Sequence, residues 1–170
     1  MSSKLHKIDY QSPIGLLEIV GTDESICSIL FTERVEIINY HCEETPGVLE
    51  LCYMELDEYF KGRRDEFTFP ITMEGTDFQK TVWNALKVIP YAKTGSYKDI
   101  AVSISNEKAI RAVGSANGKN KLSIVIPCHR IIGSNGKLTG YAGGLWRKEW
   151  LLEHERNCNM KWINPIDYPV

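Results

Sequence analysis

The stretch Ser123–Ile132, which reads Ser-Ile-Val-Ile-Pro-Cys-His-Arg-Ile-Ile, constrains this chain more than any other. A short apolar run bounded by turn residues usually forms a buried strand. Pro127, however, lacks a backbone donor, which predicts a bend or a sheet edge directly before Cys128. Cys128, His129 and Arg130 then interrupt the apolar run, and buried groups of this kind need partners or a function.

The adjacent thiol and imidazole have two interpretations. In a regular strand Cys128 and His129 would point to opposite faces, whereas a turn would let the imidazole act on the thiol directly or through one water. A thiol becomes a nucleophile when a base or a positive field lowers its pKa, and His129 and Arg130 supply both. The alternative is a buried structural cysteine beside a surface histidine, because free cysteine is among the most buried residue types.

Length and composition indicate an ordinary globular chain. With 170 residues and 43% hydrophobic content, it can form one or two compact domains with a substantial core. The N-terminus leads into an alternating pattern without an apolar signal region, and no window approaches the length of a membrane span. We therefore expect no membrane association and a cytoplasmic location, or a nuclear one in a eukaryote.

The cysteines do not suggest a disulfide framework or a metal site. Their number is odd and no Cys-x-x-Cys spacing occurs, which argues against disulfide scaffolds and zinc ribbons. His41 lies beside Cys42, but no common zinc pattern fits the spacing to the other cysteines. We expect no bound metal and at least one free thiol among Cys27, Cys42, Cys52, Cys128 and Cys158.

Charge is distributed unevenly along the chain. Residues 1–72 carry 6 Lys+Arg against 14 Asp+Glu, a balance of −8, whereas residues 73–170 carry 14 against 8, a balance of +6, in agreement with the total of −2. A basic half joined to an acidic half suggests that the second half binds a polyanion and that the first is a solvated scaffold. The alternative is a chance segregation of surface charge.

The first half reads as a small sheet covered by a helix. Residues 5–32 contain three apolar segments separated by turns at 12–15 and 21–24, which predicts an antiparallel meander. Between Pro46 and Gly62 the apolar positions recur at helical spacing, and Gly62 stands where a helix would stop. The charge changes sign beyond this helix, so we place a domain boundary near residues 70–76.

The second half reads as mainly helical. Thr76 is an expected N-cap for a helix that ends at Pro90, and Ser96 to Asp99 form an expected capping box for a short helix through Ile104. Asn106 is expected to cap a third helix that ends near Gly118. Two short helices joined by a tight turn are typical of a helix-turn-helix, although ordinary helical hairpins look the same.

The last part of the second half contains a glycine-rich loop followed by a helix. A tight turn at 133–136 is followed by a glycine-rich loop at 138–144. The final helix is expected from Leu145 to Arg156, with three leucines facing the core: Leu145, Leu151 and Leu152.

These motifs together resemble one known family, the O6-alkylguanine-DNA alkyltransferases, also called methylated-DNA–protein-cysteine methyltransferases. Pro127-Cys-His-Arg130 resembles the active-site motif of that family, and further motifs occur in the family's order and spacing over essentially the whole second half. Weaker similarities lie in the first half at 12–15 and 59–62. The other matching segments are Gly75–Gln79, Val82–Trp83, Ile89–Pro90, Ser96–Ala101, Arg111–Gly114, Asn120, Leu138–Leu145 and Lys148–Glu155.

The resemblance implies an α/β protein of two domains: a small ribonuclease-H-like antiparallel sheet plus helix at residues 1–72, and a mostly helical winged-helix-like domain at residues 73–170. It implies direct repair of O6-alkylguanine, and of O4-alkylthymine, by a single irreversible transfer of the alkyl group to the protein. The implied partner is double-stranded DNA that contains the lesion and is bound through its minor groove. A monomer with no cofactor and no obligate protein partner is expected.

The resemblance also implies roles for individual residues. Cys128 corresponds to the alkyl acceptor, His129 to its base through a bridging water, Glu155 to the acid that orients this relay, and Asn120 to the support of the active-site turn. Residue types alone favour a solvated helix residue at Glu155, next to Arg156, and an ordinary turn residue at Asn120. The pocket for the base is implied at Tyr141, which closes over the guanine, and at the backbone of Ile131 and Ala142.

DNA contacts are implied at the two short helices. Tyr97 corresponds to the residue that crowds the phosphate of the target nucleotide, and Arg111 to the finger that fills the space left by the rotated nucleotide. Rotation is required because a protein thiolate cannot reach the O6 atom of a stacked, paired guanine. The neighbouring small residues permit close approach to DNA, or alternatively tight helix packing: Ala112, Gly114, Ser115 and Ala116.

The sequence departs from the family pattern in two respects. Lys121 stands after Asn120 where the family often has proline, which puts the rigidity of that turn in question. The first half also lacks the cysteine cluster with which some relatives repair phosphotriesters, so no second repair activity is expected.

Two other functions compete with alkyl transfer. A winged-helix sensor could bind the lesion without repairing it, but such family members carry another residue at the position of Cys128. A cysteine hydrolase would need a distant histidine, and none of the candidates stands in a recognisable hydrolase context: His6, His41 and His154.

Overall fold

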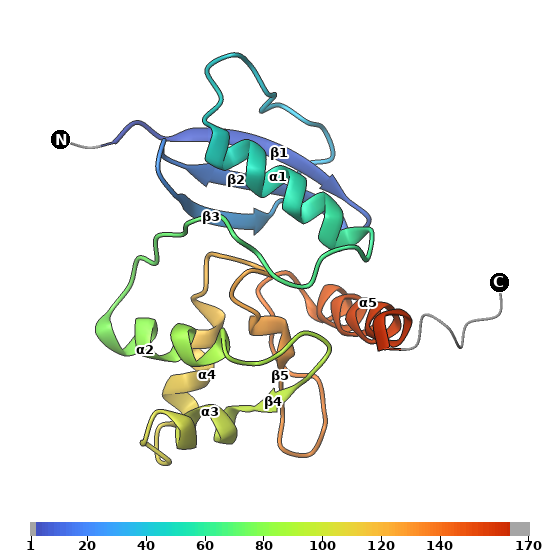
Figure 1. Ribbon diagram of the computed structural model, residues 1–170. Helices are drawn as coiled ribbons and strands as arrows, with labels where there is room; N and C mark the ends of the chain where they lie inside the picture. Colours follow the sequence, from blue (N-terminus) through green and yellow to red (C-terminus); the bar gives the residue numbers. More distant parts are fainter. Residues whose placement is uncertain (1–2, 164–170) are drawn as a thin grey trace.

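The computed structural model describes residues 3–163 and begins with a three-stranded sheet. Strands β1 (His6–Ser12), β2 (Gly15–Gly21) and β3 (Ile26–Phe31) pair antiparallel in the order β1-β2-β3, and helix α1 (Gly47–Phe60) lies across one face of the sheet (Figure 1). The meander and the covering helix expected from the sequence are confirmed.

This layer forms because buried apolar residues alternate along the strands and recur at helical spacing along α1. Ile8 pairs with Ile19, which pairs with Ile29, and all three side chains are buried. On α1 the buried positions recur every three or four residues, so one stripe of the helix covers the sheet. Gly62, with φ at +73°, follows the end of α1 in the left-handed conformation that favours glycine.

The exposed edge of β3 is used to hold the second half of the chain. The Ile29 N–H donates to the Lys121 carbonyl at 2.8 Å, and the Ser123 N–H donates to the Ile29 carbonyl at 3.1 Å. A bare strand edge presents unpaired backbone groups, which these bonds satisfy. They also attach the turn that precedes Cys128 to the sheet of the first half.

Helices α2 (Asp77–Leu86), α3 (Tyr97–Ser103) and α4 (Ile110–Gly118) pack together below the sheet (Figure 1). Thr76 is the N-cap of α2 and Ser96 forms a capping box at the start of α3, as the sequence predicts. Thr76 also forms a capping box with Gln79, which was not predicted. The fold expected from the sequence, a small antiparallel sheet with a helix followed by a mostly helical part, is confirmed.

Two predicted helix boundaries are wrong. Helix α2 ends at Leu86 rather than at Pro90, because Val88 and Ile89 bond to carbonyls only three residues back, which tightens and ends the helix. Helix α4 begins at Ile110 with Ala109 as its N-cap, because the carbonyl of Asn106 is used in a turn with the Ala109 N–H.

Helix α5 (Leu145–Ile163) is longer than predicted. No glycine or proline stands between Arg156 and Ile163, so nothing in the local sequence stops the helix at Arg156. Leu151 is buried as expected, but the prediction that Leu145 faces the core is wrong, since this side chain is 48% exposed. Leu145 lies in the first turn, before the helix reaches the core.

The Ser123–Ile132 stretch is mostly turn rather than strand. It contains a 3-10 helix, η1 (Cys128–Arg130), and then β5 (Ile131–Ile132), which pairs in parallel with β4 (Gly95–Ser96). Pro127 directly precedes η1, which agrees with the bend expected before Cys128. The β4–β5 pair, which the sequence did not predict, brings the start of α3 next to the end of this segment.

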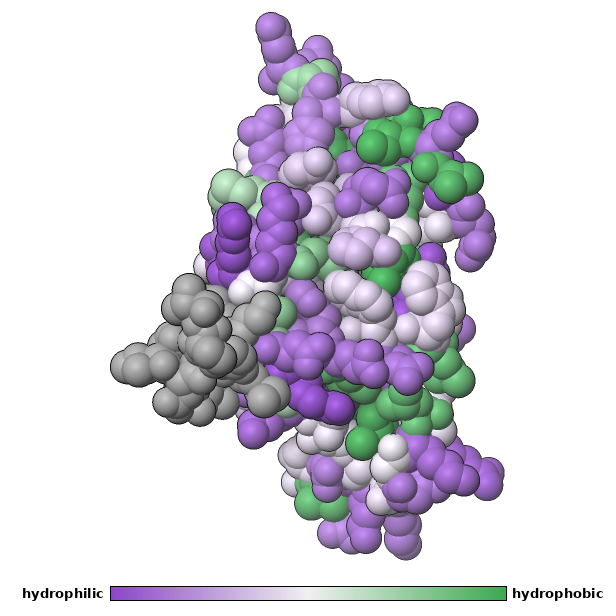
Figure 2. All heavy atoms as spheres, turned by 90° about the vertical axis from the view of Figure 1, so that its right-hand side faces the viewer, coloured by the Kyte–Doolittle hydropathy of each residue, from purple (hydrophilic) through white to green (hydrophobic). Residues whose placement is uncertain are grey.

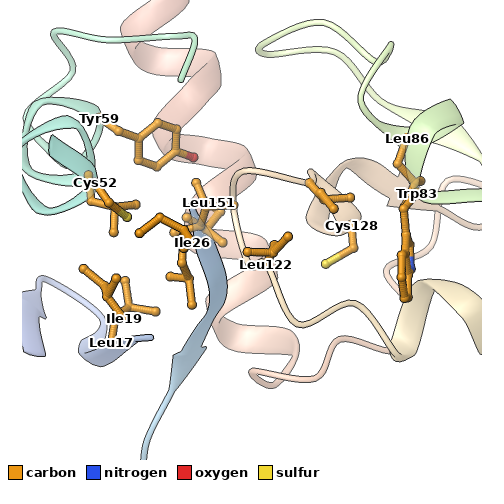
Figure 3. Close-up of a cluster of buried hydrophobic side chains, with 14 of the residues drawn as sticks. Leu17, Ile19, Ile26, Cys52, Tyr59, Trp83, Leu86, Leu122, Cys128 and Leu151 are labelled. Carbon is orange, nitrogen blue, oxygen red and sulfur yellow. The ribbon is translucent and has the colours of Figure 1, made fainter. Parts of the chain in front are cut away.

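One hydrophobic core runs through both halves. Figure 3 shows the labelled side chains of this cluster, from Leu17 and Cys52 in the first half to Cys128 and Trp83 in the second. On the surface, hydrophilic and hydrophobic side chains are mixed on the face shown in Figure 2. None of the helices within residues 3–163 is both long enough and apolar enough to span a bilayer.

A buried carboxylate anchors the long loop after β3. Asp9 accepts hydrogen bonds from the Arg34 guanidinium at 3.1 Å and from the backbone N–H groups of Ile38 and Asn39 at 2.9 and 3.0 Å. Burial alone would raise the pKa of Asp9, but the bonds from Arg34 and Asn39 together hold that pKa well below its usual value.

We predict that Asp9→Asn lowers the free energy of unfolding at pH 7 by about 2 kcal/mol, because a buried acceptor for several donors loses its charge. The depressed pKa means that the stabilisation is complete above the unfolded-state pKa of about 3.9 and is lost as the pH falls through the lower folded-state pKa. Urea unfolding between pH 2 and pH 7 should therefore show a smaller acid-induced loss in the variant. An unchanged acid profile would contradict this account.

Candidate active site

Cys128 lies in the core at the start of η1, with only 4% of its surface exposed. Its Sγ atom accepts a hydrogen bond from Nδ2 of Asn120 at 3.3 Å. Burial raises the pKa of the thiol, and the bond from Asn120 and the charge of Lys148 oppose this effect only in part. At neutral pH the resting group is therefore a thiol, which needs a base before it can act as a nucleophile.

Asn120 also holds the turn that leads to the thiol. Its Nδ2 donates to the Ile126 carbonyl at 2.9 Å, and its Oδ1 accepts from the Leu122 N–H at 2.9 Å. Between these residues Ile124 has φ at +73°, which is strained for a β-branched residue and needs support from its surroundings. The turn is thus held by the amide of Asn120, while Lys121, at the position where the family often has proline, is exposed.

His129 and Glu155 form a buried pair beside the thiol. Nε2 of His129 lies 2.6 Å from Oε2 of Glu155, and neither side chain is exposed. Burial lowers the pKa of His129, so the imidazole is neutral. Burial would raise the pKa of Glu155, but the contacts with His129 and Arg130 hold it far below its usual value, so the carboxylate is ionised.

These charge states determine the tautomer of His129. An ionised carboxylate can only accept, so Nε2 of His129 must carry the proton that it shares with Glu155. Nδ1 is then an acceptor, and this buried atom has no hydrogen-bond partner among residues 3–163. A buried, unpartnered imidazole nitrogen next in sequence to a buried thiol is suited to receive a proton.

The Glu155 carboxylate binds groups from several parts of the chain. Arg130 donates from Nε to Oε1 at 2.8 Å and from Nη2 to Oε2 at 3.1 Å, and the Ala92 N–H donates to Oε1 at 3.1 Å. Tyr59, at the end of α1, donates its hydroxyl to Oε2 at 2.6 Å. Both oxygens are thereby fixed in position.

Lys148 is a buried cation near the thiol. Its Nζ donates to the carbonyls of Thr139 and Gly140 at 2.7 and 3.4 Å, which anchors the glycine-rich loop to α5. Burial lowers the pKa of this ammonium group to about 8, and the nearby Cys128 thiol opposes that shift.

The residues implied in binding the base come from β5 and from the glycine-rich loop. Ile131 is buried in β5, Ala142 is exposed, and the hydroxyl of Tyr141 is buried without a hydrogen-bond partner in the described part of the chain. Arg147 attaches the loop to the first half by donating to the Gly143 carbonyl at 2.9 Å and to the Ile14 carbonyl at 2.7 Å.

The residues implied in DNA contact lie on α4 and at the start of α3. Arg111, Ala112 and Ser115 are exposed on α4. Gly114 faces Tyr97, because a Cβ atom at this glycine would lie 3.8 Å from the tyrosine ring. Tyr97 also binds the glycine-rich loop by donating its hydroxyl to the Thr139 carbonyl at 3.3 Å.

Sequence reasoning assigned no role to Tyr59, Lys148 or Arg147. A signal for Lys148 does exist, since it stands three and seven residues before Leu151 and Glu155 on the buried stripe of α5. The same spacing places Tyr59 on the buried stripe of α1. That its hydroxyl meets Glu155, 96 positions later, has no local signal.

The remaining histidines occupy other environments. His6 lies 3.3 Å from Asp23, His41 packs against Tyr53, and His154 binds the Tyr59 carbonyl. No group of three His, Cys, Asp or Glu side chains that could hold a metal ion occurs within residues 3–163.

Comparison with known proteins agrees with this geometry. The family model described as "6-O-methylguanine DNA methyltransferase, ribonuclease-like domain" matches residues 5–73, and the model described as "6-O-methylguanine DNA methyltransferase, DNA binding domain" matches residues 77–157. The methylated-DNA–protein-cysteine methyltransferase of Methanosarcina acetivorans is 45% identical over 152 residues, which cover 88% of this chain and 97% of that protein.

The chain belongs to the 6-O-methylguanine DNA methyltransferase family, whose members are named methylated-DNA–protein-cysteine methyltransferases. Solved structures agree: the O6-methylguanine methyltransferase of Mycobacterium tuberculosis superposes with a TM-score of 0.80 at 41% identity, covering 91% of this chain and 94% of that one. The M. tuberculosis protein OGT in complex with DNA gives 0.79 at 43% identity, covering 91% and 93%. The resemblance noted in the sequence is confirmed, and with it a DNA-binding repair enzyme that works by direct alkyl transfer.

We predict that Asn120→Ala lowers the free energy of unfolding by about 1–3 kcal/mol, because the buried Leu122 N–H and Ile126 carbonyl lose their partner. It should also slow alkylation of Cys128 by iodoacetamide, since the thiolate loses a donor. Peptide mass mapping isolates the reaction of Cys128 from that of the other cysteines. Ser123→Ala, a buried polar change in the same turn, is the control, and equal rates in both variants would contradict the assignment.

Proposed function

We propose that this methyltransferase repairs O6-alkylguanine, and also O4-alkylthymine, in double-stranded DNA by moving the alkyl group irreversibly to Cys128. The observation that carries the proposal is the neutral His129, whose Nε2 is bound to an ionised Glu155 and whose buried Nδ1 has no partner in the described residues. The arrangement supplies the base and the orienting acid that a nucleophilic thiol needs.

The chemistry requires one displacement. Nδ1 of His129 takes the thiol proton, through a bridging water, while Glu155 stabilises the imidazolium that forms. The Cys128 thiolate then attacks the alkyl carbon, so that a sulfur–carbon bond forms and the bond from that carbon to O6 breaks. Guanine leaves with the electron pair of the broken bond and takes up one proton, which balances the thiol proton that His129 received.

The product explains why the protein should act once. The thioether at Cys128 has no leaving group comparable with guanine, and its hydrolysis would have to expel a thiolate. Of the other cysteines, Cys158 is the candidate because it is close to Glu155 in sequence, but its side chain lies against Gly62 and His154. We therefore regard the reaction as self-inactivating.

Nucleotide rotation is the proposed route by which the buried thiol reaches its substrate. We propose that α4 enters the minor groove, that Arg111 fills the space of the rotated nucleotide, and that Ala112, Gly114 and Ser115 allow close approach to the backbone. The exposure of Arg111, Ala112 and Ser115 on α4 supports this assignment, as does the position of Tyr97 against Gly114. Tyr141, Ala142 and the backbone of Ile131 are proposed to receive the base.

The domain boundaries, the absence of a cofactor and of an obligate protein partner, and the cellular location are also proposals. We propose that residues 1–72 form the first domain and residues 73–170 the DNA-binding domain, on the basis of the charge change between them. No obligate protein partner and no cofactor are proposed, and the cytoplasmic location stays a prediction.

We predict that one equivalent of alkyl group is transferred per protein molecule. Intact mass after incubation with a duplex that contains O6-methylguanine should rise by one methyl group, and peptide mapping should place it on Cys128. Repair should plateau at one equivalent in the presence of a chelator. Cys128→Ser is the control without an acceptor; turnover beyond one equivalent would overturn the proposal, and lesion binding without modification of Cys128 would indicate a sensor.

We predict that Arg111→Ala slows repair of duplex DNA at least about tenfold but leaves the reaction with free O6-methylguanine base unchanged, because the free base needs no rotation out of a helix. Single-turnover rates on both substrates measure this difference. Lys119→Ala, which removes another exposed cation at the end of the same helix, controls for the loss of charge. Equal losses on both substrates would show that Arg111 supports the fold instead.

A further inference from the structure

Tyr59 brings a hydroxyl group from the first half of the chain to the Glu155 carboxylate. The residue lies in the last turn of α1 and its side chain is completely buried. Its hydroxyl oxygen is 2.6 Å from Oε2 of Glu155, the same oxygen that lies 2.6 Å from Nε2 of His129. Figure 3 shows the Tyr59 ring extending from α1 with its hydroxyl away from the helix.

The direction of this hydrogen bond is determined by charge. Burial and the neighbouring Glu155 raise the pKa of Tyr59 well above its usual value, so the phenol keeps its proton. The ionised carboxylate can only accept. Tyr59 therefore donates, and Oε2 of Glu155 is fixed between the phenol and the imidazole, with Arg130 at 3.1 Å as a further donor.

We propose that Tyr59 is a positioning residue of the alkyl-transfer reaction. Its hydroxyl holds Glu155 in the orientation that accepts the proton of His129 Nε2, and this keeps Nδ1 available as the base. The inference rests on the proposed function, because Tyr59 acts through the relay. It also assigns the first half of the chain a part in the chemistry beyond that of a scaffold.

Other contacts explain why the effect should be partial. Arg130 binds both oxygens of Glu155, and the Ala92 N–H binds Oε1, so the carboxylate stays in the site without the phenol. What is lost in Tyr59→Phe is one charge-assisted donor to the oxygen that His129 uses. Loss of such a bond corresponds to a decrease of about tenfold in the rate of repair.

Tyr10 offers a matched control. It is also a buried tyrosine of the first half, and its hydroxyl donates to a carboxylate, Asp57, at 3.0 Å. Asp57 binds Lys61 on the surface of α1 and is not part of the relay. Tyr10→Phe and Tyr59→Phe therefore remove the same group from comparable bonds, only one of which leads to His129.

The test is a double-mutant cycle on single-turnover repair of a duplex that contains O6-methylguanine, with Tyr59→Phe, Glu155→Gln and the double variant. We expect Tyr59→Phe to slow the reaction about tenfold in the native background and to have no further effect beside Glu155→Gln. The imidazole ¹⁵N resonances of His129 should move in Tyr59→Phe and stay unchanged in Tyr10→Phe. Urea unfolding of both variants checks that they fold.

The following results would overturn the inference. If folded Tyr59→Phe repaired DNA at the native rate and the His129 resonances did not move, Tyr59 would contribute only to packing of the core. Equal slowing by Tyr59→Phe with and without Glu155→Gln would show that it does not act through the carboxylate. If Glu155→Gln alone repaired DNA at the native rate, the proposed relay itself would be wrong. If Glu155→Gln were slow but Tyr59→Phe repaired at the native rate, only the role of Tyr59 would be wrong.

Discussion

The buried carboxylate of Glu155 is the group on which the arrangement of this methyltransferase depends. An ion taken out of water costs several kcal/mol unless charged and hydrogen-bonding partners surround it. Here those partners come from α1 through Tyr59, from the loop before β4 through the Ala92 N–H, and from η1 through His129 and Arg130. The requirement to satisfy one buried charge therefore joins the two halves of the chain at the point where the reaction is proposed to occur.

The same requirement gives the site its chemical character. Cys128 lies within the hydrophobic core, where burial keeps it a neutral thiol. The ionised Glu155 binds Nε2 of His129 and so keeps the imidazole in the tautomer that can receive a proton. A resting thiol is less exposed to oxidants and unwanted electrophiles than a permanent thiolate. A thiol that is neutral at rest is consistent with the proposal that the protein reacts only once.

The strained turn and the loop opposite it are stabilised in the same way, by polar groups that are buried and bonded. Asn120 supports Ile124 in a left-handed conformation, and the turn is attached to the edge of β3 through Lys121 and Ser123. Lys148 and Arg147 hold the glycine-rich loop to α5 and to the first hairpin. Loss of packing in the first half would therefore disturb both the turn before Cys128 and the glycine-rich loop.

The sequence alone determined those structural features that depend on residues close to one another in the chain. Local interactions over a few residues account for the N-cap at Thr76, the capping box at Ser96, the buried stripe of α1, the stop at Gly62 and the bend at Pro127. The motif around Cys128 and His129 is contiguous in the sequence. The start of α4 was mispredicted because the Asn106 carbonyl is used in a turn with the Ala109 N–H, and the end of α5 because no local signal marks it. Only the tertiary structure decided that Tyr59 meets Glu155, that Lys148 is buried beside the loop, and that β3 binds the turn before the thiol. Each of these contacts joins distant positions, and which distant groups meet is settled by the packing of the whole core and by the need to pair every buried charge.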